Sequence, residues 1–315
     1  MTTYKEINGT NIEAVASDPS NPVEGQVWYN TTSNTVKANY INPGSWSTGG
    51  SLNTARATLA GAGTQTAALA FGGGGPNAQT ESYNGTAWTE VNDLNTARYY
   101  LAGCGTNTAA LGFGGSTPPT VNALTELWNG TNWTEVNDLN TARKGMGGTG
   151  TQTAGLGFGG SLPAISALTE TWNGTNWTEV NDLNIGRRDM GTAGTNTSAL
   201  GFGGYGPPFA GQTELWNGTN WTAVNAMQTA KVSLAGAGAT STAALGFGGT
   251  PPTTTATELW NGTNWTEVND MGTARYNLGG AGTTTAALGF GGQTPTVAAT
   301  EEWNVGPATV TFDNS

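Results

Sequence analysis

Residues 125–143 of this chain read TELWNGTNWTEVNDLNTAR. Near copies of this stretch begin at Thr80, Thr169, Thr213 and Thr257. A second stretch, such as LAGCGTNTAALGFGG at 101–115, accompanies each copy and ends in Phe-Gly-Gly. Phe-Gly-Gly occurs six times, at intervals of 42, 45, 44, 45 and 43 residues. Short apolar runs and turn residues that repeat with this period are typical of small four-stranded sheets in a ring or array.

Four strand-like runs fit into one repeat. In one cycle the pattern predicts strands at residues 99–104, 108–114, 123–128 and 132–137. An Asn-Gly pair lies between the third and fourth runs, and it favours a hairpin because both residues tolerate positive φ. The hairpin places Trp128 and Trp133 side by side on one face of the sheet. Because similar aromatic pairs recur along the chain, we predict that they pack between adjacent sheets instead of forming exposed ligand platforms.

The composition indicates an ordered, acidic protein. The 315 residues include 50 Gly and 12 Trp, and only 10% are charged, which is too few to keep a chain expanded. The formal net charge is −11 at pH 7, so we predict no nucleic-acid partner. Residues 1–22 lack the basic and apolar regions of a standard signal peptide, and no apolar run is long enough to span a membrane. We therefore predict no membrane insertion.

Each repeat carries a diglycine after an apolar run and then two spaced aromatic residues. The diglycines are Gly72-Gly73, Gly114-Gly115, Gly159-Gly160, Gly203-Gly204, Gly248-Gly249 and Gly291-Gly292. Over residues 46–304 this pattern resembles the Kelch family of β-propellers, and the resemblance implies four-stranded blades around a central axis. The two aromatics lie closer together in the sequence than the Tyr and Trp of Kelch repeats. We therefore expect a shorter hairpin than the Kelch pattern has.

Unpaired aromatics at the two ends of the repeat region predict how the array closes. Trp303 has no following aromatic partner, and Trp46 has no preceding one. A ring in which a strand at 45–48 completes the sheet begun by residues 276–304 pairs both and removes open sheet edges. We therefore predict an all-β, six-bladed propeller closed by an N-terminal strand. The alternatives are a seventh blade built from QVWYN, TVKANY and ATVTF, or closure by ATVTF itself.

Most charged residues occupy repeat positions. One position holds Glu81, Glu126, Glu170, Glu214, Glu258 and Glu301. Another holds Arg56, Arg98, Arg143, Arg187, Lys231 and Arg275. We predict that these two sets are structural partners, paired within or between sheets. A further acidic set in Asn-Asp turns is predicted to bond to the backbone. Its members are Asp93, Asp138, Asp182 and Asp270.

Few residues outside the repeat positions could carry chemistry. The chain has no His and one Cys, so zinc and redox-metal sites are not expected. No pair of non-repeat acids in the propeller region fits a glycosidase. Cys104 occupies a small-residue position and is predicted to pack in the core. We therefore predict no metal, no cofactor and no enzymatic activity.

The segments after the diglycines vary in length and sequence. These variable loops are residues 74–79, 116–124, 161–168, 205–212, 250–256 and 293–299. Loops of one type emerge on one face of a propeller, so we predict a variable binding surface on a constant scaffold. The candidate contact residues are Tyr205, Pro207, Pro208, Phe209, Leu162, Ile165, Pro118 and Pro251. The competing interpretation is that these residues only cover the rim of the propeller.

Residues 1–42 differ from the repeat, and we predict that they form an attachment segment with a β-hairpin, leaving 43–315 as the propeller. DPSNPVEGQVWYNTTSNTVKANY, residues 18–40, resembles a hairpin module of marine bacteriophage virion proteins, where a similar sequence precedes Kelch-like repeats. The resemblance implies a protein of the phage particle. We predict that strands at 26–30 and 35–40 pair with another protein. The candidate attachment residues are Trp28, Tyr29 and Lys37.

The sequence therefore favours a non-enzymatic virion protein, such as a tail-fibre, tail-tip or decoration protein. Its predicted partners are other virion proteins and a receptor or glycan on the host surface. Its predicted localisation is the phage particle. The alternative is a secreted or surface lectin, extracellular, with one shallow glycan pocket per blade at the aromatic and Asn/Asp positions. A third interpretation is a passive scaffold whose partners bind the N-terminal segment alone.

Overall fold

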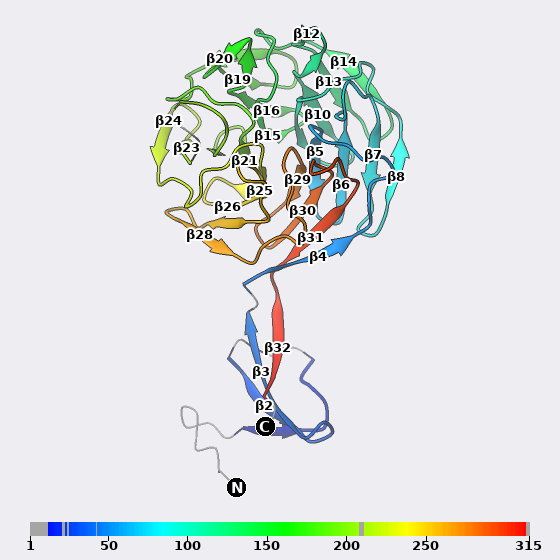
Figure 1. Ribbon diagram of the computed structural model, residues 1–315, viewed down its shortest axis with the longest axis vertical. Helices are drawn as coiled ribbons and strands as arrows, with labels where there is room; N and C mark the ends of the chain where they lie inside the picture. The colour runs from blue at the N-terminus through cyan, green and yellow to red at the C-terminus, as the bar shows by residue number, and fades with distance from the viewer. Residues whose placement is uncertain (1–11, 21–22, 24, 42, 208–210, 313–315) are drawn as a thin grey trace. The chain divides into compact units, whose positions relative to one another are not determined.

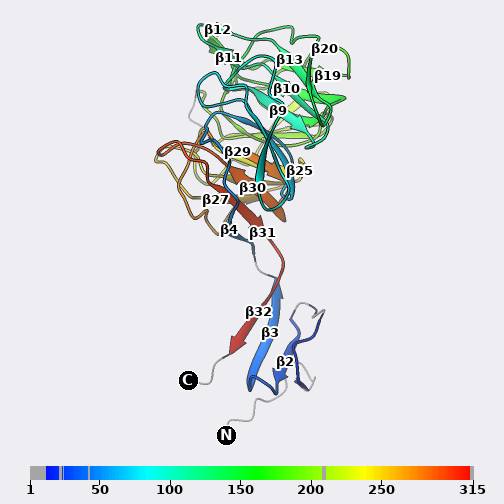
Figure 2. The same ribbon diagram turned by 90° about the vertical axis from the view of Figure 1, so that its right-hand side faces the viewer.

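The structure is a computed structural model that describes residues 12–20, 23, 25–41, 43–207 and 211–312 (Figures 1 and 2). The secondary-structure elements assigned in these residues are all β-strands. The chain divides into two compact units. Unit 1 comprises Met1–Gly44 and Val305–Ser315, and unit 2 comprises Ser45–Asn304. This division differs from the predicted boundary at the C-terminal end, because the last strand belongs to unit 1.

Unit 2 contains six four-stranded antiparallel sheets. In five of them the strands follow one another along the chain, and the sixth takes one strand from the start of unit 2. The first two are β5 (Ala60–Thr64), β6 (Ala67–Phe71), β7 (Thr80–Tyr83), β8 (Trp88–Val91) and β9 (Ala102–Gly105), β10 (Ala110–Phe113), β13 (Thr125–Trp128), β14 (Trp133–Val136). The next two are β15 (Gly147–Thr151), β16 (Ala154–Phe158), β19 (Thr169–Trp172), β20 (Trp177–Val180) and β21 (Gly191–Gly194), β22 (Ala199–Phe202), β23 (Thr213–Trp216), β24 (Trp221–Val224). The last two are β25 (Ala235–Thr240), β26 (Ala243–Phe247), β27 (Thr257–Trp260), β28 (Trp265–Val268) and β29 (Gly279–Gly282), β30 (Ala286–Phe290), β31 (Thr300–Asn304), β4 (Ser45–Gly49).

The sixth sheet takes its outer strand from the start of unit 2. β4 pairs with β31 so that Trp46 lies opposite Trp303. The predicted completion of the last sheet by residues 45–48 is therefore confirmed. Pairing of Ser45 with Asn304 also puts the two ends of unit 2 at the same end of this sheet. The variable loop of the sheet, which precedes Thr300, lies at its opposite end.

The first strands of the six sheets lie around a common centre. β5, β9, β15, β21, β25 and β29 each contact the first strands of the preceding and following sheets, and β29 contacts β5. Figure 1 shows these strands at the middle of unit 2, with the fourth strands at its periphery. This is the strand arrangement of propeller blades, so unit 2 has a propeller-like, all-β architecture.

The glycine content follows from crowding at this centre. A Cβ on Gly103 of β9 would lie 2.5 Å from the Phe71 ring of the preceding sheet. A Cβ on Gly280 of β29 would lie 2.5 Å from the carbonyl oxygen of Gly236 on β25. Larger residues at Gly103 and Gly280 would push the first strands apart. Five of the six first strands have glycine at this position, and the fourth has Thr192. Close packing at the centre therefore accounts for these five glycines.

Aromatic residues join neighbouring sheets. Trp133 of β14 packs on Phe71 of the preceding sheet, with ring centroids 4.8 Å apart, and its Nε1 donates to Thr80 Oγ1 at 3.0 Å. Trp128 lies opposite Trp133 across the hairpin. Trp46 makes the same contacts, to Phe247 at 4.8 Å between centroids and to Thr257 Oγ1 at 3.0 Å. The prediction that the tryptophans pack between sheets is confirmed.

The predicted hairpin between the aromatics is also present. Trp128 and Trp133 flank a four-residue loop in which Gly130 has a φ of +91°. Asn129 Oδ1 accepts hydrogen bonds from the backbone N–H groups of Thr131 and Asn132, at 2.9 and 2.8 Å. The side chain of Asn129 thus stabilises the turn that its Asn-Gly sequence predicts.

The structure also contains smaller sheets and a separate four-stranded sheet, in addition to the six sheets described above. Two variable loops fold into two-stranded hairpins, β11 (Ser116–Thr117) with β12 (Thr120–Val121) and β17 (Ser161–Leu162) with β18 (Ala164–Ile165). Unit 1 forms its own four-stranded sheet. Its order is β1 (Glu13–Val15), β2 (Val27–Asn30), β3 (Thr35–Ile41) and β32 (Pro307–Phe312).

The terminal strand ATVTF neither closes the array nor adds a blade to unit 2. It lies in β32, which pairs antiparallel with β3 from Val36 opposite Phe312 to Ile41 opposite Pro307. The alternative that grouped QVWYN, TVKANY and ATVTF is right to place these three strands in one sheet, but that sheet belongs to unit 1 and not to unit 2. Closure of the array by ATVTF is wrong. The reason is local, because β3 offers β32 a longer pairing than any outer strand of unit 2.

The contacts between sheets give a prediction about stability. Trp133→Ala should lower the free energy of unfolding by about 3–5 kcal/mol, because it empties a buried site between two sheets. Trp46→Ala should also destabilise, but by less, because Trp46 is half-buried. The measurement is chemical denaturation followed by circular dichroism.

The matched control for this prediction is Thr134→Ala, an exposed position on β14 next to Trp133. It should change the free energy of unfolding by less than about 0.5 kcal/mol. Wild-type stability in Trp46→Ala would mean that β4 contributes nothing to the sixth sheet.

Candidate functional site

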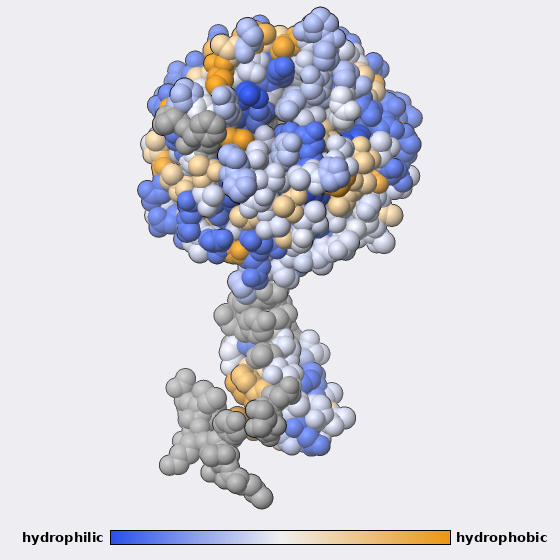
Figure 3. Space-filling model, in the orientation of Figure 1, coloured by the Kyte–Doolittle hydropathy of each residue, from blue (hydrophilic) through white to orange (hydrophobic). Residues whose placement is uncertain are grey.

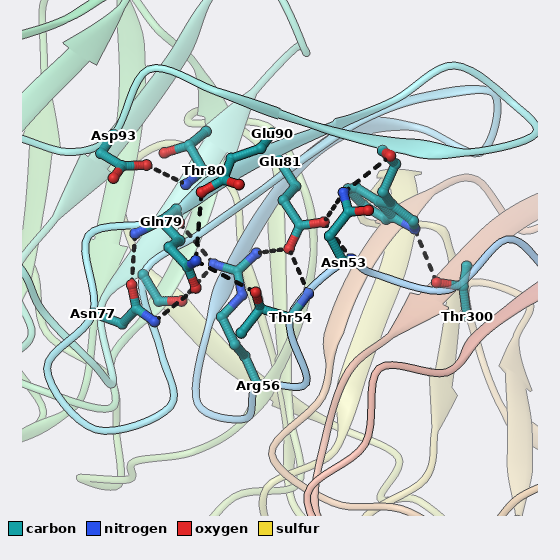
Figure 4. A network of polar contacts seen from close by, with 12 residues as sticks. Asn53, Thr54, Arg56, Asn77, Gln79, Thr80, Glu81, Glu90, Asp93 and Thr300 are labelled. Atoms are coloured by element: carbon teal, nitrogen blue, oxygen red, sulfur yellow. Dashed lines mark hydrogen bonds and ion pairs between the residues drawn. The ribbon is translucent and has the colours of Figure 1, made fainter.

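In five of the six sheets of unit 2, a buried arginine anchors both ends of the variable loop, and in the fifth sheet Lys231 takes its place and bonds only to the end at Ala256. Arg98 Nη1 donates to the carbonyl oxygens of Gly114 at 2.9 Å and Leu124 at 2.7 Å, which lie where the loop begins and ends. Its Nη2 donates to Glu126 Oε1 at 2.7 Å. Figure 4 shows the equivalent network around Arg56 in the first sheet. We call each such residue with its glutamate an arginine clamp.

The clamp recurs in every sheet of unit 2. Its ion pairs are Arg56–Glu81, Arg98–Glu126, Arg143–Glu170, Arg187–Glu214, Lys231–Glu258 and Arg275–Glu301. Each pair joins residues of one sheet, and the side chains are buried. The predicted Glu–Arg pairing is confirmed. Burial lowers the pKa of Arg98, and the charge of Glu126 opposes that shift.

The remaining oxygens of the repeat acids are also occupied. Glu126 Oε2 accepts from the backbone N–H of Asn95 at 2.7 Å and from Asn95 Nδ2 at 2.9 Å. Asp138 Oδ1 accepts from the backbone N–H of Thr125 at 3.1 Å. Asp93, Asp182 and Asp270 make the equivalent bond in their own sheets. The predicted bonds from these aspartates to the backbone are confirmed, and they hold the third strand to the turn after the fourth.

The candidate contact residues of the variable loops are mostly exposed. Leu162 and Tyr205 are 41% and 38% exposed. Pro118, Pro207 and Pro251 are exposed as well, whereas Ile165 is half-buried. Pro208 and Phe209 lie outside the described residues. On the side of unit 2 visible in Figure 3, apolar residues form small patches among polar ones. Exposed side chains suit either interpretation, so binding of a partner by these loops stays a prediction.

Each clamp is followed by two residues that differ from sheet to sheet. These pairs are Ala57-Thr58, Tyr99-Tyr100, Lys144-Gly145, Arg188-Asp189, Val232-Ser233 and Tyr276-Asn277. Five of the six first members form a β-bridge to a variable loop, such as Arg188 to Tyr205. The Arg188 guanidinium carbon also lies 4.8 Å from the centroid of the Tyr205 ring. The pairs therefore extend the variable surface from the loops towards the centre.

The second members of these pairs form a closed ring of backbone hydrogen bonds. Each N–H donates to the carbonyl oxygen of the equivalent residue in the preceding sheet, at 2.7–2.9 Å. The donors, in order, are Tyr100 to Thr58, Gly145 to Tyr100, Asp189 to Gly145, Ser233 to Asp189, Asn277 to Ser233 and Thr58 to Asn277. We call these six residues the axial ring.

All six residues of the axial ring have left-handed backbone conformations. Their φ values lie between +54° and +64°. Only one of them, Gly145, is a glycine, and the others place five different side chains at the ring. A non-glycine residue in this conformation costs about 1–3 kcal/mol and is often found at functional sites. The side chains here vary although the strained backbone is constant.

The axial ring surrounds a small pocket of about 90 Å³ at the loop end of the first strands. Beneath the ring, the pocket is lined by one Leu or Met from each sheet. These residues are Leu59, Leu101, Met146, Met190, Leu234 and Leu278. The pocket thus combines a polar, variable rim with an apolar, constant floor.

Asp189 is the acid of this axial pocket. Its side chain is 8% exposed, and Arg188 Nη1 donates to its Oδ2 at 2.5 Å. A Cβ added to Gly145 would lie 2.4 Å from the Oδ1 atom of Asp189. The glycine therefore leaves room for the carboxyl group. Burial raises the pKa of Asp189 to about 6, although the charges of Arg188 and Lys144 oppose that shift.

Sequence reasoning missed the axial ring. The predicted binding residues are in the loops, and the acids outside the repeat positions are considered only as a possible glycosidase pair. Asp189 is an acid of this kind, without a second acid beside it in the lining of the axial pocket. The available signal was the pair of variable positions that follows each clamp residue, of which the second reads Thr, Tyr, Gly, Asp, Ser and Asn and is followed by a Leu or Met in every sheet. Two variable positions between constant ones indicate a place where the repeat does not fix the residue.

Two of the three candidate attachment residues have internal roles in unit 1. Trp28 is fully buried, and its Nε1 donates to Asp18 Oδ1 at 3.0 Å. Lys37 Nζ pairs with Asp18 Oδ2 at 2.7 Å, and this bond is the main cause that lowers the pKa of Asp18 to about 2. Tyr29 is half-buried and donates to Asn34 Oδ1 at 3.3 Å.

The predicted strand pairing with another protein through residues 26–30 and 35–40 is wrong. β2 pairs with both β1 and β3, and β3 pairs with both β2 and β32. Neither strand has a free edge, because β32 occupies the side of β3 that the sequence leaves open. The outer strands of the sheet in unit 1 are β1 and β32.

The glycan pockets of the lectin alternative are not formed in the sheets. Trp128 and Trp133 are buried, and their Nε1 atoms already donate to Asn107 O and Thr80 Oγ1. The Asp of the same repeat bonds to the backbone. In this repeat the aromatic and Asp side chains are therefore not free at the surface to form the pocket that the lectin alternative expects. Cys104 is buried as predicted, and burial raises the pKa of its thiol to about 12.

Comparison with protein-family models gives no match, and comparison with curated proteins gives no similar sequence. Within the described ranges, no group of three or more His, Cys, Asp or Glu side chains is placed to hold a metal ion. In the same ranges there is no helix with the length and apolar character needed to cross a membrane.

The clamps give a prediction that compares Lys with Arg. Lys231 is the one lysine at the clamp position, and its Nζ lies 3.0 Å from Glu258 Oε1 and 3.4 Å from Ala256 O. Lys231→Arg should raise the free energy of unfolding by about 1–2 kcal/mol, because guanidinium can also reach the carbonyl oxygen of Gly248. The matched reverse change, Arg143→Lys, should lower it by a similar amount. Equal stability of all three proteins in urea titrations would contradict this role.

Asp189 gives a prediction about pH. Its pKa is higher in the folded chain than the usual 3.8 of the unfolded chain, so the folded state binds its proton more tightly. This stabilisation is complete below pH 4 and is lost as the pH rises through about 6, up to about 3 kcal/mol in total. Asp189→Asn should remove this part of the pH dependence. Parallel stability curves for the two proteins between pH 4 and 7 would contradict the prediction.

Proposed function

We propose that this chain is a non-enzymatic structural and adhesion protein of a phage particle, such as a tail-fibre, tail-tip or decoration protein. In this proposal the variable loops and the axial ring recognise a host surface or a neighbouring subunit. The observation that carries it is the concentration of sequence variation at one end of six nearly identical sheets. Recognition proteins commonly place variable loops on a constant scaffold in this way.

We also propose that the six sheets of unit 2 are the blades of a closed, Kelch-like propeller. The support is the completion of the sixth sheet by β4 and the unbroken ring of six backbone hydrogen bonds. In a closed ring every first strand lies between two other first strands at the centre. The fourth strand is then the outward edge of each sheet. Such a scaffold can carry different loops without exposing new sheet edges.

The bonding of the repeat acids supports a non-enzymatic role. Each clamp glutamate is paired with its Arg or Lys, and the aspartates described above accept backbone hydrogen bonds. A general acid or base needs a carboxyl group that can reach a substrate. The acid at the axial pocket, Asp189, is paired with Arg188 and has no second acid beside it in the lining of that pocket.

The virion setting rests on the resemblance of residues 18–40 to a module of marine phage virion proteins. The fold of unit 1 is compatible with a role in attachment, although not through the strands first considered. Its outer strands β1 and β32 are the candidates for pairing with another virion protein. Within unit 2, the two ends of the unit, Ser45 and Asn304, and the variable loop before Thr300 lie at opposite ends of the sixth sheet.

The test is a loop exchange in the intact protein. Replacing residues 205–212 by the sequence of residues 293–299 should leave the chain folded and present in purified particles, and should change the surface to which the particles adsorb. The measurements are mass spectrometry of the particles and an adsorption assay on a panel of host strains.

The matched control exchanges a hairpin at the other end of the sheets, residues 106–109, for residues 283–286. This change should leave both particle composition and adsorption unchanged. Absence of the wild-type chain from purified particles would contradict the virion role. Unchanged adsorption after exchange of residues 205–212 would contradict recognition by that loop.

A further inference from the structure

The axial pocket has the features of a built binding site. Its rim positions are rigid, because each residue of the axial ring donates a backbone hydrogen bond to the preceding sheet. The rim residues are half-buried, and the side chain of Asp189 is enclosed, at 8% exposed. Its floor consists of buried Leu and Met side chains. A pocket of this kind offers polar groups around the edge of a ligand and an apolar surface beneath it.

The rim presents neutral hydrogen-bonding groups. Ser233 contributes a hydroxyl that makes no hydrogen bond within the described part of the chain. Asn277 contributes an amide, which donates to Gln293 Oε1 at 3.0 Å. Asp189 contributes a carboxyl whose charge is paired with Arg188. Hydroxyls, an amide and a paired carboxyl together suit a ligand with several hydroxyl groups and no net charge.

An aromatic surface borders the same pocket. The rings of Tyr99 and Tyr100 lie 5.1 Å apart between centroids, and both residues are half-buried. Tyrosine offers an apolar ring face and a polar hydroxyl in one side chain. A sugar ring has the complementary character, with C–H groups on its faces and hydroxyl groups at its edge.

Other ligand classes fit less well. An anion would meet Asp189 and find the guanidinium of Arg188 already paired. A metal ion would find one carboxyl group at the pocket, and no group of three potential ligands in the described residues. A peptide needs a larger site, because pockets for drug-sized ligands occupy about 300–1,000 Å³. A volume of about 90 Å³ suits the edge of one sugar residue.

We propose that the axial pocket binds a terminal neutral sugar of a glycan, with one site per chain. This inference rests on the proposed recognition role and names the ligand class of its central site. It differs from a lectin with one pocket per blade, because the six sheets together form a single site. The loops then surround the sugar and contact the rest of the target. In particular, Tyr205 contacts Arg188, which pairs with the pocket residue Asp189.

The test measures sugar binding to the full chain by ligand-observed NMR. The probes are the methyl glycosides of neutral hexoses, 6-deoxyhexoses and N-acetylhexosamines, with glucuronate as the anionic comparison. The expected result is millimolar binding of at least one neutral sugar and none of glucuronate. Tyr100→Asn and Asp189→Asn should each weaken that binding by about tenfold or more. Both substitutions keep a residue that tolerates a left-handed backbone.

The control variant is Thr285→Ala in the hairpin between β29 and β30, at the opposite end of the sixth sheet, and it should bind as the wild type does. Melting curves establish that each variant is folded. A third variant, Ser233→Asn, enlarges a rim side chain and keeps the test valid if one of the others fails to fold. Absence of neutral-sugar binding, or binding that all folded pocket variants retain, would overturn the inference.

Failure of this inference and failure of the proposed function give different results. If exchange of residues 205–212 changes adsorption while the pocket variants do not, recognition by the loops stands and the sugar site is wrong. If the chain is absent from particles but binds a sugar through the pocket, the site stands and the virion role is wrong.

Discussion

The structure of unit 2 depends on the buried ion pair between the clamp residue and its glutamate. One guanidinium joins the first and last residues of a variable loop to the third strand, as Arg98 does with Gly114, Leu124 and Glu126. An unpaired charge in this position would be destabilising by about 3–5 kcal/mol. The pair therefore fixes where each loop begins and ends. Between these two points the sequence is free to change, because the bonds that hold the sheet do not involve the residues of the loop tip.

The same constraint explains why a chain with few aliphatic residues has an ordered core. Glycines on the first strands allow close approach at the centre, and tryptophans such as Trp133 fill the space between neighbouring sheets. The clamp then positions the residue pair that follows it, which carries the axial ring. One repeated set of contacts thus accounts for the packing between sheets, for the fixed ends of the variable loops and for the axial ring. The residues that vary lie at the loop end of the sheets.

Much of the fold could be predicted because it repeats. The four strands per repeat, the Asn-Gly hairpin, the paired tryptophans and the role of Trp46 all follow from spacing that recurs along the chain. The errors concern features about which the repeat pattern gives no information. The partner of the ATVTF strand is unit 1, and no periodic pattern indicates this. Trp28 and Lys37 were expected at a docking surface because they stand outside the repeat, but Asp18 binds both inside unit 1. The axial ring was missed because its residues become neighbours only when six sheets surround a common centre.

The central claim is that the clamps and the axial ring hold a constant scaffold, and that this scaffold does not depend on the residues of the variable loops. Native-state hydrogen exchange tests this directly, because it measures the opening free energy of individual amides. The account predicts that the amides of Tyr100, Gly145 and Asp189 exchange only through global unfolding. Amides within the variable loops, such as those of Thr120 and Ala164, should exchange through local opening at much lower free energy. Exchange of ring and loop amides with the same opening free energy would contradict the account.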